Sequence, residues 1–197
     1  MKIKKILFAL FAVLALSTLT SCNYNSLVEK QQTVDQAWAQ VENQYQRRAD
    51  LIPNLVNTVK GYAQHESSTL ESVTRARSGL TKAYDAAQSA EATPENIEEY
   101  QQAQSNLKGA LDIYVNAVKE AYPDLKANTN FMDLQTQLEG TENRISTERL
   151  RYTEAVQEYN TAIKKFPTNI YAGWFGFKEK PQFKAEAGAQ KAPTVEF

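Results

Sequence analysis

The strongest constraint on the fold is a column of large side chains that recurs every seven residues in the C-terminal half of the chain. This column holds Phe131, Leu138, Ile145, Tyr152, Tyr159 and Phe166, and the neighbouring column holds Leu134, Thr141, Glu148, Ala155 and Ala162. Steps of alternately three and four residues place side chains on one helix face, the face that packs on other helices. The pattern predicts a long helix over about residues 130–165.

A similar repeat runs from residue 25 to about residue 62. Its two columns hold Leu27, Val34, Val41, Arg48, Leu55 and Tyr62, and Trp38, Tyr45, Ile52 and Val59. Pro53 interrupts this segment, and proline removes a backbone donor and clashes with the preceding helical turn. Asp50 has the side chain to cap a restarted helix. We therefore expect a kink or a short break near Asp50–Pro53, with the packed face continuing beyond it.

Two further amphipathic segments lie between these long repeats. Residues 64–90 carry Leu70, Val73, Arg77, Leu80, Tyr84 and Ala87 on one face. The next segment starts at Thr93 and Pro94, which suit the cap and the first position of a helix. Its columns hold Ile97, Gln104, Leu111 and Val118, and Tyr100, Leu107, Tyr114 and Ala121. It is expected to stop before Pro123, since the residue ahead of a proline avoids helical geometry.

Four amphipathic helices with short connections predict an all-α fold. We expect an elongated antiparallel (up-and-down) four-helix bundle over residues 22–166, with a kinked long first helix. The heptad pattern ends at Pro167, and Pro181 and Pro193 follow. Residues 167–197 are therefore predicted to form an extended C-terminal tail that packs on the bundle.

The N-terminus has the three parts of a secretory signal. Lys2, Lys4 and Lys5 precede an uninterrupted apolar run over residues 6–16, and small and polar residues then lead to Cys22. A charged start, a short apolar middle and a small-residue end are typical of a signal peptide, here residues 1–21. A membrane-spanning helix needs roughly 20 predominantly apolar residues, so this segment is marginal as a span. An uncleaved membrane anchor remains the alternative.

Leu19-Thr20-Ser21-Cys22 resembles the lipobox of bacterial lipoproteins. The resemblance implies that Cys22, the only cysteine in the chain, receives a diacylglyceryl group and becomes the first mature residue. Two acyl chains are sufficient for stable membrane anchoring. Residues 22–197 would then work in the cell envelope, on the outer side of the cytoplasmic membrane. Asn23 stands where many lipoproteins of the inner membrane carry aspartate, and the choice between inner and outer membrane stays open.

Several long blocks of the chain resemble the LemA family. They are "YNSLV" from Tyr24, "AWAQVENQYQRRADLIPNLVNTVKGYAQHE" from Ala37, "YPDLKANTNFMDLQTQLEGTENRI" from Tyr122, and "GFKEKPQFKAE" with the final "APTVEF". The resemblance implies an antiparallel helical bundle attached to a membrane through its N-terminus, and it supplies no catalytic residue. Many relatives carry a spanning helix where this chain has a lipobox.

Two charged residues occupy columns that should face the bundle interior. Arg48 lies in a core column of the first long repeat, and Glu148 lies in a column of the last one, close to Glu142. A charge in a core must find a partner. We predict that Arg48 meets Glu148 or Glu142 across the bundle. The polar layer would fix the register of the helices, and a ligand site is the alternative.

Residues for catalysis, metal binding or cofactor binding are scarce. His65 is the only histidine, and a zinc site would have to be built from carboxylates, which is unusual. No phosphate-binding glycine loop occurs. We expect no catalytic residues, no metal and no cofactor. Nucleic acid is an unexpected partner, because 22 Lys and Arg stand against 23 Asp and Glu.

The segment over residues 169–183 is the most apolar stretch outside the helices and the signal. Trp174, Phe175, Phe177 and Phe183 either cover the bundle surface or contact a partner or a membrane.

These observations favour a membrane-anchored envelope lipoprotein that acts as a non-enzymatic scaffold or protein-interaction module. Its partners would be membrane lipid, through acylated Cys22, and other envelope proteins, in an oligomeric state that the heptad columns leave open. An accessory subunit of a membrane protease or transport complex is a second hypothesis. An envelope-polymer binder or enzyme that uses the region of Arg48 and Glu148 is a third.

Overall fold

The fold was obtained as a computed structural model that describes residues 2–61, 67–88 and 94–183, with side chains over 24–61, 69–87 and 95–183. The helices are α1 (Lys2–Lys60), α2 (Ser67–Gln88), α3 (Pro94–Ala121), η1 (Pro123–Ala127), α4 (Thr129–Lys164), α5 (Thr168–Tyr171) and η2 (Ala172–Phe175). The described residues contain no strand. The all-helical class predicted from the heptad pattern is therefore confirmed.

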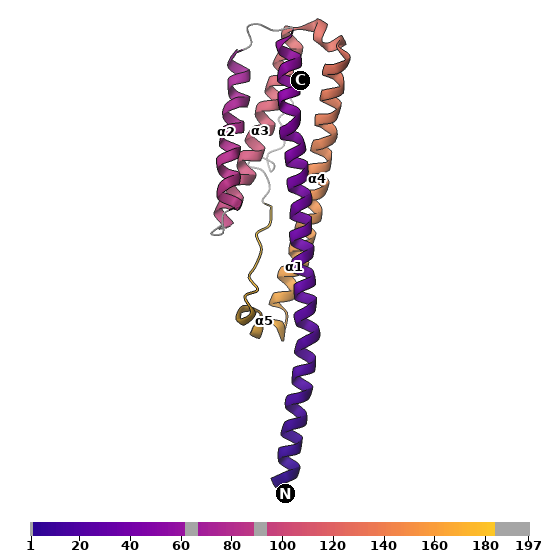
Figure 1. Ribbon diagram of the computed structural model, residues 1–197, viewed down its shortest axis with the longest axis vertical. Coiled ribbons are helices and arrows are strands. Elements are labelled where there is room, and N and C mark those ends of the chain that lie inside the picture. The colour runs from indigo at the N-terminus through magenta and orange to yellow at the C-terminus, as the bar shows by residue number, and fades with distance from the viewer. Residues whose placement is uncertain (1, 62–66, 89–93, 184–197) are drawn as a thin grey trace, which may run out of the picture.

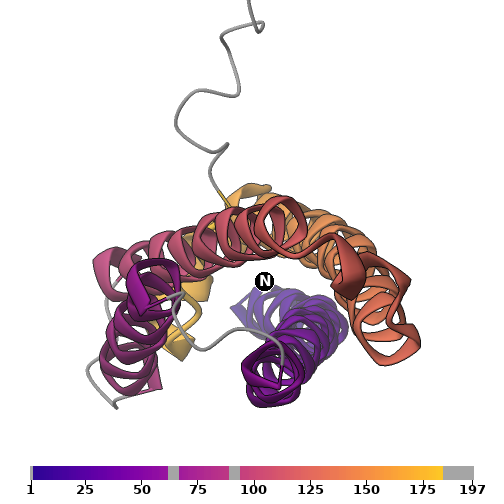
Figure 2. The same cartoon turned by 90° about the horizontal axis from the view of Figure 1, so that it is seen from above.

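The four long helices run alternately up and down, and they pack in two pairs (Figure 1). α1 packs along α4, and α2 packs along α3. The view from above shows α1 and α2 standing apart (Figure 2). The N-terminal part of α1 continues alone beyond α5 (Figure 1).

The predicted columns of α1 and α4 form the core. In α1 the first column is buried at Leu27, Val34, Val41, Arg48 and Leu55. In α4 the column is buried at Phe131, Leu138, Ile145, Tyr152 and Tyr159. The last predicted member is wrong, because the side chain of Phe166 is 81% exposed. α4 ends at Lys164, and the chain turns through a cis peptide bond between Phe166 and Pro167.

Proline does not break the first helix. The sequence predicted a kink or short break near Asp50–Pro53, but α1 is one helix that contains Pro53. The side chain of Asp50 accepts a hydrogen bond from Gln46 within α1. Leu51 and Ile52 are buried and Pro53 is exposed, so the proline ring lies on the solvent side while packing holds the helix together. The packed face does continue beyond it, as predicted.

The tail is less extended than predicted. Residues from Thr168 to Phe175 form the two short helices α5 and η2, which end at Gly176. Gly176 has φ 81°, a left-handed conformation that residues with a Cβ rarely adopt. Only after Gly176 does the chain become extended and run back along the bundle (Figure 1). Residues 184–197, the last part of the predicted tail, lie outside the described residues.

Candidate functional site

A buried arginine of α1 contacts two other long helices. Arg48 of α1 is 2% exposed. Its Nη1 donates to Oε1 of Glu142 on α4 at 2.7 Å. Its Nη2 donates to the backbone carbonyl of Gln104 on α3 at 3.0 Å, and also to the side-chain Oε1 of Gln104. Arg48 therefore connects α1 to both α3 and α4, which belong to different helix pairs.

Aromatic residues surround this polar layer. The Arg48 guanidinium lies 5.4 Å from the ring centroid of Tyr45. Gln104 donates through Nε2 to the hydroxyl of Tyr100 at 2.9 Å, and Trp38 and Tyr84 pack against the Tyr100 ring. Burial raises the pKa of Tyr100 well above its usual value, against the opposing effect of the Gln104 hydrogen bond. The layer is a well-packed network in which Nε of Arg48 has no hydrogen-bond partner.

The structure selects one of the two glutamates proposed as the partner of Arg48. Glu142 is the partner, whereas Glu148 accepts from Arg151 of its own helix at 2.8 Å. Glu148 is therefore not part of the layer. Sequence reasoning did not identify Gln104 as a member. The signal was its polar side chain within a core column of α3, the same anomaly that singled out Arg48 in α1.

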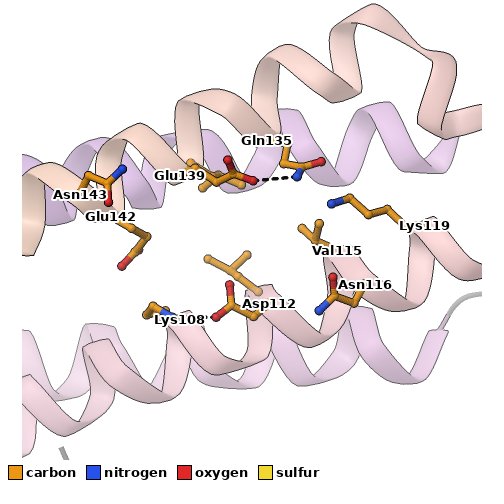
Figure 3. Close-up of a pocket in the computed structure, with 11 residues that line it drawn as sticks. Lys108, Asp112, Val115, Asn116, Lys119, Gln135, Glu139, Glu142 and Asn143 are labelled. Carbon is orange, nitrogen blue, oxygen red and sulfur yellow. Dashed lines mark hydrogen bonds and ion pairs between the residues drawn. The ribbon is translucent and has the colours of Figure 1, made fainter.

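An open groove lies between α3 and α4 on one side of this layer (Figure 3). We call it the α3–α4 groove, and its volume is about 560 Å³. Its apolar lining consists of Leu111, Val115 and Leu138. Its charged lining consists of Lys108, Asp112, Lys119, Glu139 and Glu142. Within the lining, Lys108 pairs with Asp112 at 2.7 Å, and Gln135 donates to Glu139 at 2.7 Å (Figure 3).

A second cavity of about 340 Å³ adjoins the groove and reaches Arg48. The two share Lys108, Glu142 and Asn143 in their linings. The second cavity is also lined by residues that do not line the groove, among them Gln101, Ser105, Ser146 and Arg149. The carboxylate of Glu142, which is 25% exposed, thus lies between the buried arginine and the open groove.

The four aromatic residues of the tail divide into two groups. Phe177 is 8% exposed, and Phe183 packs on the core with its ring 6.0 Å from Trp38 and 5.2 Å from Tyr152. Trp174 and Phe175 are 81% and 60% exposed. Packing on the bundle therefore accounts for the first two residues and leaves the second two unexplained.

Hydrogen bonds hold the extended part of the tail against α4 and α1. The hydroxyl of Tyr152 donates to the carbonyl of Pro181 at 2.9 Å. Asn160 and the backbone of Lys180 exchange two hydrogen bonds, each 2.9 Å long. Lys180 also reaches Asp35 of α1 at 3.1 Å. The tail over residues 177–183 is therefore an integral layer of the domain.

Nothing among the described residues resembles a metal centre or a membrane span. In this part of the chain no three His, Cys, Asp or Glu side chains are grouped to hold a metal ion. In the same part, no helix is both long enough and apolar enough to cross a membrane. The side chain of Cys22 and the whole of His65 lie outside the described residues. The lipid attachment at Cys22 therefore stays a prediction.

Comparisons with known proteins support the resemblance seen in the sequence. The chain is 24% identical to Protein LemA of Metamycoplasma hominis over 176 residues, which cover 86% of this chain and 74% of that protein. It is also 35% identical over 79 residues to the magnetosome proteins MamQ 1 and MamQ 2 of Paramagnetospirillum magneticum, a match to 40% of this chain and 29% of each relative. The sequence profile of the LemA family matches residues 37–197. The chain belongs to the LemA family.

Proposed function

We propose that this protein is a membrane-anchored lipoprotein of the bacterial envelope that acts as a non-enzymatic scaffold. The four helices act as one bundle on the outer side of the cytoplasmic membrane, held there by acylated Cys22. A segment of a partner envelope protein binds in the α3–α4 groove.

The chemistry of the α3–α4 groove carries this proposal. Its apolar floor at Leu111, Val115 and Leu138 suits the side chains of an amphipathic peptide. Charges of both signs line the walls, so a partner segment with alternating charges is better complemented than one of a single sign. The groove offers shape and charge for recognition, and none of the described residues that line it is a serine, threonine, cysteine or histidine.

Site-specific photo-crosslinking tests the groove. A photoreactive residue at Asn116, which is exposed in the groove, is expected to capture a partner in intact cells. The matched control is the same residue at Ser78, which is exposed on α2 away from the groove. Equal crosslinking from both positions, or none from Asn116, would contradict a specific groove partner.

The crosslinked species also separates the scaffold from its rivals. A single protease or transport subunit captured in stoichiometric amount would favour the accessory-subunit hypothesis. Captured glycan would favour an envelope-polymer binder. That second candidate is supported by the amides and hydroxyls of Gln101, Ser105, Asn143 and Ser146 in the cavity beside Arg48. Such groups can hydrogen-bond to sugar hydroxyls.

Metabolic labelling tests the anchor. Labelled palmitate should enter the wild-type protein and should not enter a Cys22→Ser variant. The same label on both proteins would overturn acylation at Cys22. A full-length unlabelled chain that stays in the membrane would instead favour the uncleaved anchor.

A further inference from the structure

One end of the bundle carries a cluster of exposed apolar side chains. We call it the apolar cap, and it consists of Tyr24, Phe166, Ile170, Trp174 and Phe175, whose exposed fractions run from 39% to 81%. The other large exposed apolar side chains of the described residues are Tyr84, Ile113, Met132 and Leu150, which are spread over α2, α3 and α4. Four members of the cap come from the single segment over residues 166–175, and the fifth, Tyr24, contacts Phe175 of that segment.

Ring contacts with neighbouring aromatic residues hold part of the cap in place. The ring of Tyr24 on α1 lies 5.3 Å from Phe175 and 5.6 Å from Phe177, in edge-on contacts. Tyr171, which is buried, also packs on Phe175, with the ring centroids 6.1 Å apart. Tyr24 and Tyr171 thus support Phe175, while the Trp174 side chain beside it remains 81% exposed. A free aromatic surface of this kind usually marks a contact.

The position of the cap identifies what it contacts. α5 lies beside α1 at the level where α1 leaves the bundle and continues alone toward the N-terminus (Figure 1). Tyr24 follows Cys22 by two residues, which is about 3 Å along a helix axis. It follows the apolar run over residues 6–16 by eight residues, or about 12 Å. The cap therefore lies close enough to contact the lipid headgroups, whether the anchor is an acylated Cys22 or an uncleaved helix.

The residue types at the cap also fit a membrane interface. Tryptophan and tyrosine are enriched where a membrane meets water, because their rings are apolar and their tips are polar. Four lysines lie between positions 164 and 180. Lys164 pairs with Glu179 at 2.8 Å and Lys180 pairs with Asp35 at 3.1 Å, whereas Lys165 and Lys178 are exposed beside the cap. Lysines beside an apolar surface favour anionic lipid headgroups.

We propose that the apolar cap inserts into the surface of the membrane that holds the N-terminus, and so fixes the bundle against it. This inference rests on the membrane anchor of the proposed function. Anchoring through α1 alone would leave the bundle free to tilt, since a single attachment fixes one point. A second contact through α5 and η2 adds a second point. The two contacts together fix the orientation of the bundle on the membrane, and therefore the direction in which the α3–α4 groove opens.

The two tryptophans of the chain allow a direct test. Trp174 is in the cap, and Trp38 is half-buried under Phe183, about 21 Å further along α1 than Tyr24. Protein purified from its own membrane, with whatever N-terminus it carries there, is reconstituted in vesicles of phosphatidylethanolamine and phosphatidylglycerol, with and without brominated acyl chains. Bromine quenches only tryptophans that reach the acyl region. Brominated lipid should quench the wild-type emission, and Trp174→Phe should abolish this quenching while retaining the Trp38 emission.

Flotation of the same vesicles separates the failure of the cap from the failure of the anchor. Protein that floats with the vesicles but is not quenched keeps the anchor and refutes the membrane contact, which would point to a protein partner at the cap. Protein that does not float refutes the anchor, and the cap proposal falls with it. Quenching that persists unchanged in Trp174→Phe would also refute the proposal, because Trp38 would then be the group at the membrane.

Discussion

Replacing Arg48 by methionine tests whether the central polar layer is a structural element. Methionine follows the arginine side chain only as far as the position of Nε and carries no charge, so the variant removes the guanidinium group together with the three hydrogen bonds of Arg48. Gln104, which is 3% exposed, loses the donor to its side-chain oxygen, and Glu142 loses its ionic partner. The question is how much these two losses cost.

The surroundings of the two acceptors set the magnitude. A buried acceptor left without a partner costs about 1–3 kcal/mol. Removing one member of a fully buried ion pair costs about 3–5 kcal/mol. Glu142 is 25% exposed and lines the α3–α4 groove, so water can hydrate its carboxylate and reduce that cost. We therefore expect Arg48→Met to lower the free energy of unfolding by about 2–4 kcal/mol, an amount that a domain of ordinary stability survives.

Urea unfolding followed by circular dichroism at 222 nm measures this loss. Glu71→Gln is the matched control, because Glu71 pairs with Arg75, both side chains are more than two-thirds exposed, and such pairs contribute about 0–1 kcal/mol. The double variant Arg48→Met/Glu142→Met removes the stranded carboxylate, and it should recover about 1–2 kcal/mol relative to Arg48→Met. Arg48→Met within about 0.5 kcal/mol of wild type, or a double variant less stable than both single variants, would refute the reasoning.

The structure also predicts the direction of the stability change in three further experiments. Burial raises the pKa of Tyr100 and of Tyr152, and the unfolded chain ionises near its ordinary value of about 10. The free energy of unfolding should therefore be constant below about pH 10 and fall above it, by up to about 1.4 kcal/mol per pH unit for each buried tyrosine. Urea midpoints measured between about pH 8 and 11 check this, and the fall should be shallower in Tyr152→Phe than in the wild type. Pro53→Ala should stabilise the protein by about 1–3 kcal/mol, because α1 continues through this exposed position, and an unchanged urea midpoint would count against that view. Gly140→Ala should raise the thermal midpoint by an amount equivalent to about 0.5–1 kcal/mol, because this site is helical and the added Cβ would meet no side chain or neighbouring helix within 4 Å. Gly176→Ala should lower the midpoint by an amount equivalent to about 1–2 kcal/mol, because Gly176 has φ 81°. A shift of the same sign in both variants would be inconsistent with the backbone argument.

The faces of the helices were predictable because a heptad repeat records burial directly. Each described position in the first α1 column, from Leu27 to Leu55, is buried as predicted. The two errors near prolines have opposite signs. At Pro53 the local preference for a break is outweighed by the packing of Leu51, Ile52 and Leu55. At Pro167 the local preference prevails, because the residue before a proline avoids helical geometry, so α4 ends at Lys164 and Phe166 is exposed.

The tail shows a second limit of pattern reading. Phe177 and Phe183 are buried by contacts with residues far away in sequence, such as Tyr24 and Trp38. Trp174 lies three residues from Phe177 and is exposed. Four aromatic residues in one short segment look alike in the sequence, and only the path of the chain around Gly176 decides which of them reach the core.

Whether Arg48 meets Glu142 or Glu148 depends on the register of α1 against α4. The heptad pattern of one helix does not specify how that helix is aligned along its neighbour. Trp38 faces Tyr152 at 5.2 Å and Arg48 faces Glu142. The step from Trp38 forward to Arg48 matches in length the step from Tyr152 back to Glu142, as two antiparallel helices require. Glu148 lies six residues along α4 from Glu142, so it is displaced from Arg48 by about 9 Å along the helix axis. The Trp38–Tyr152 contact and the Arg48–Glu142 ion pair therefore agree with one register of α1 against α4, in which Glu142 and not Glu148 lies opposite Arg48.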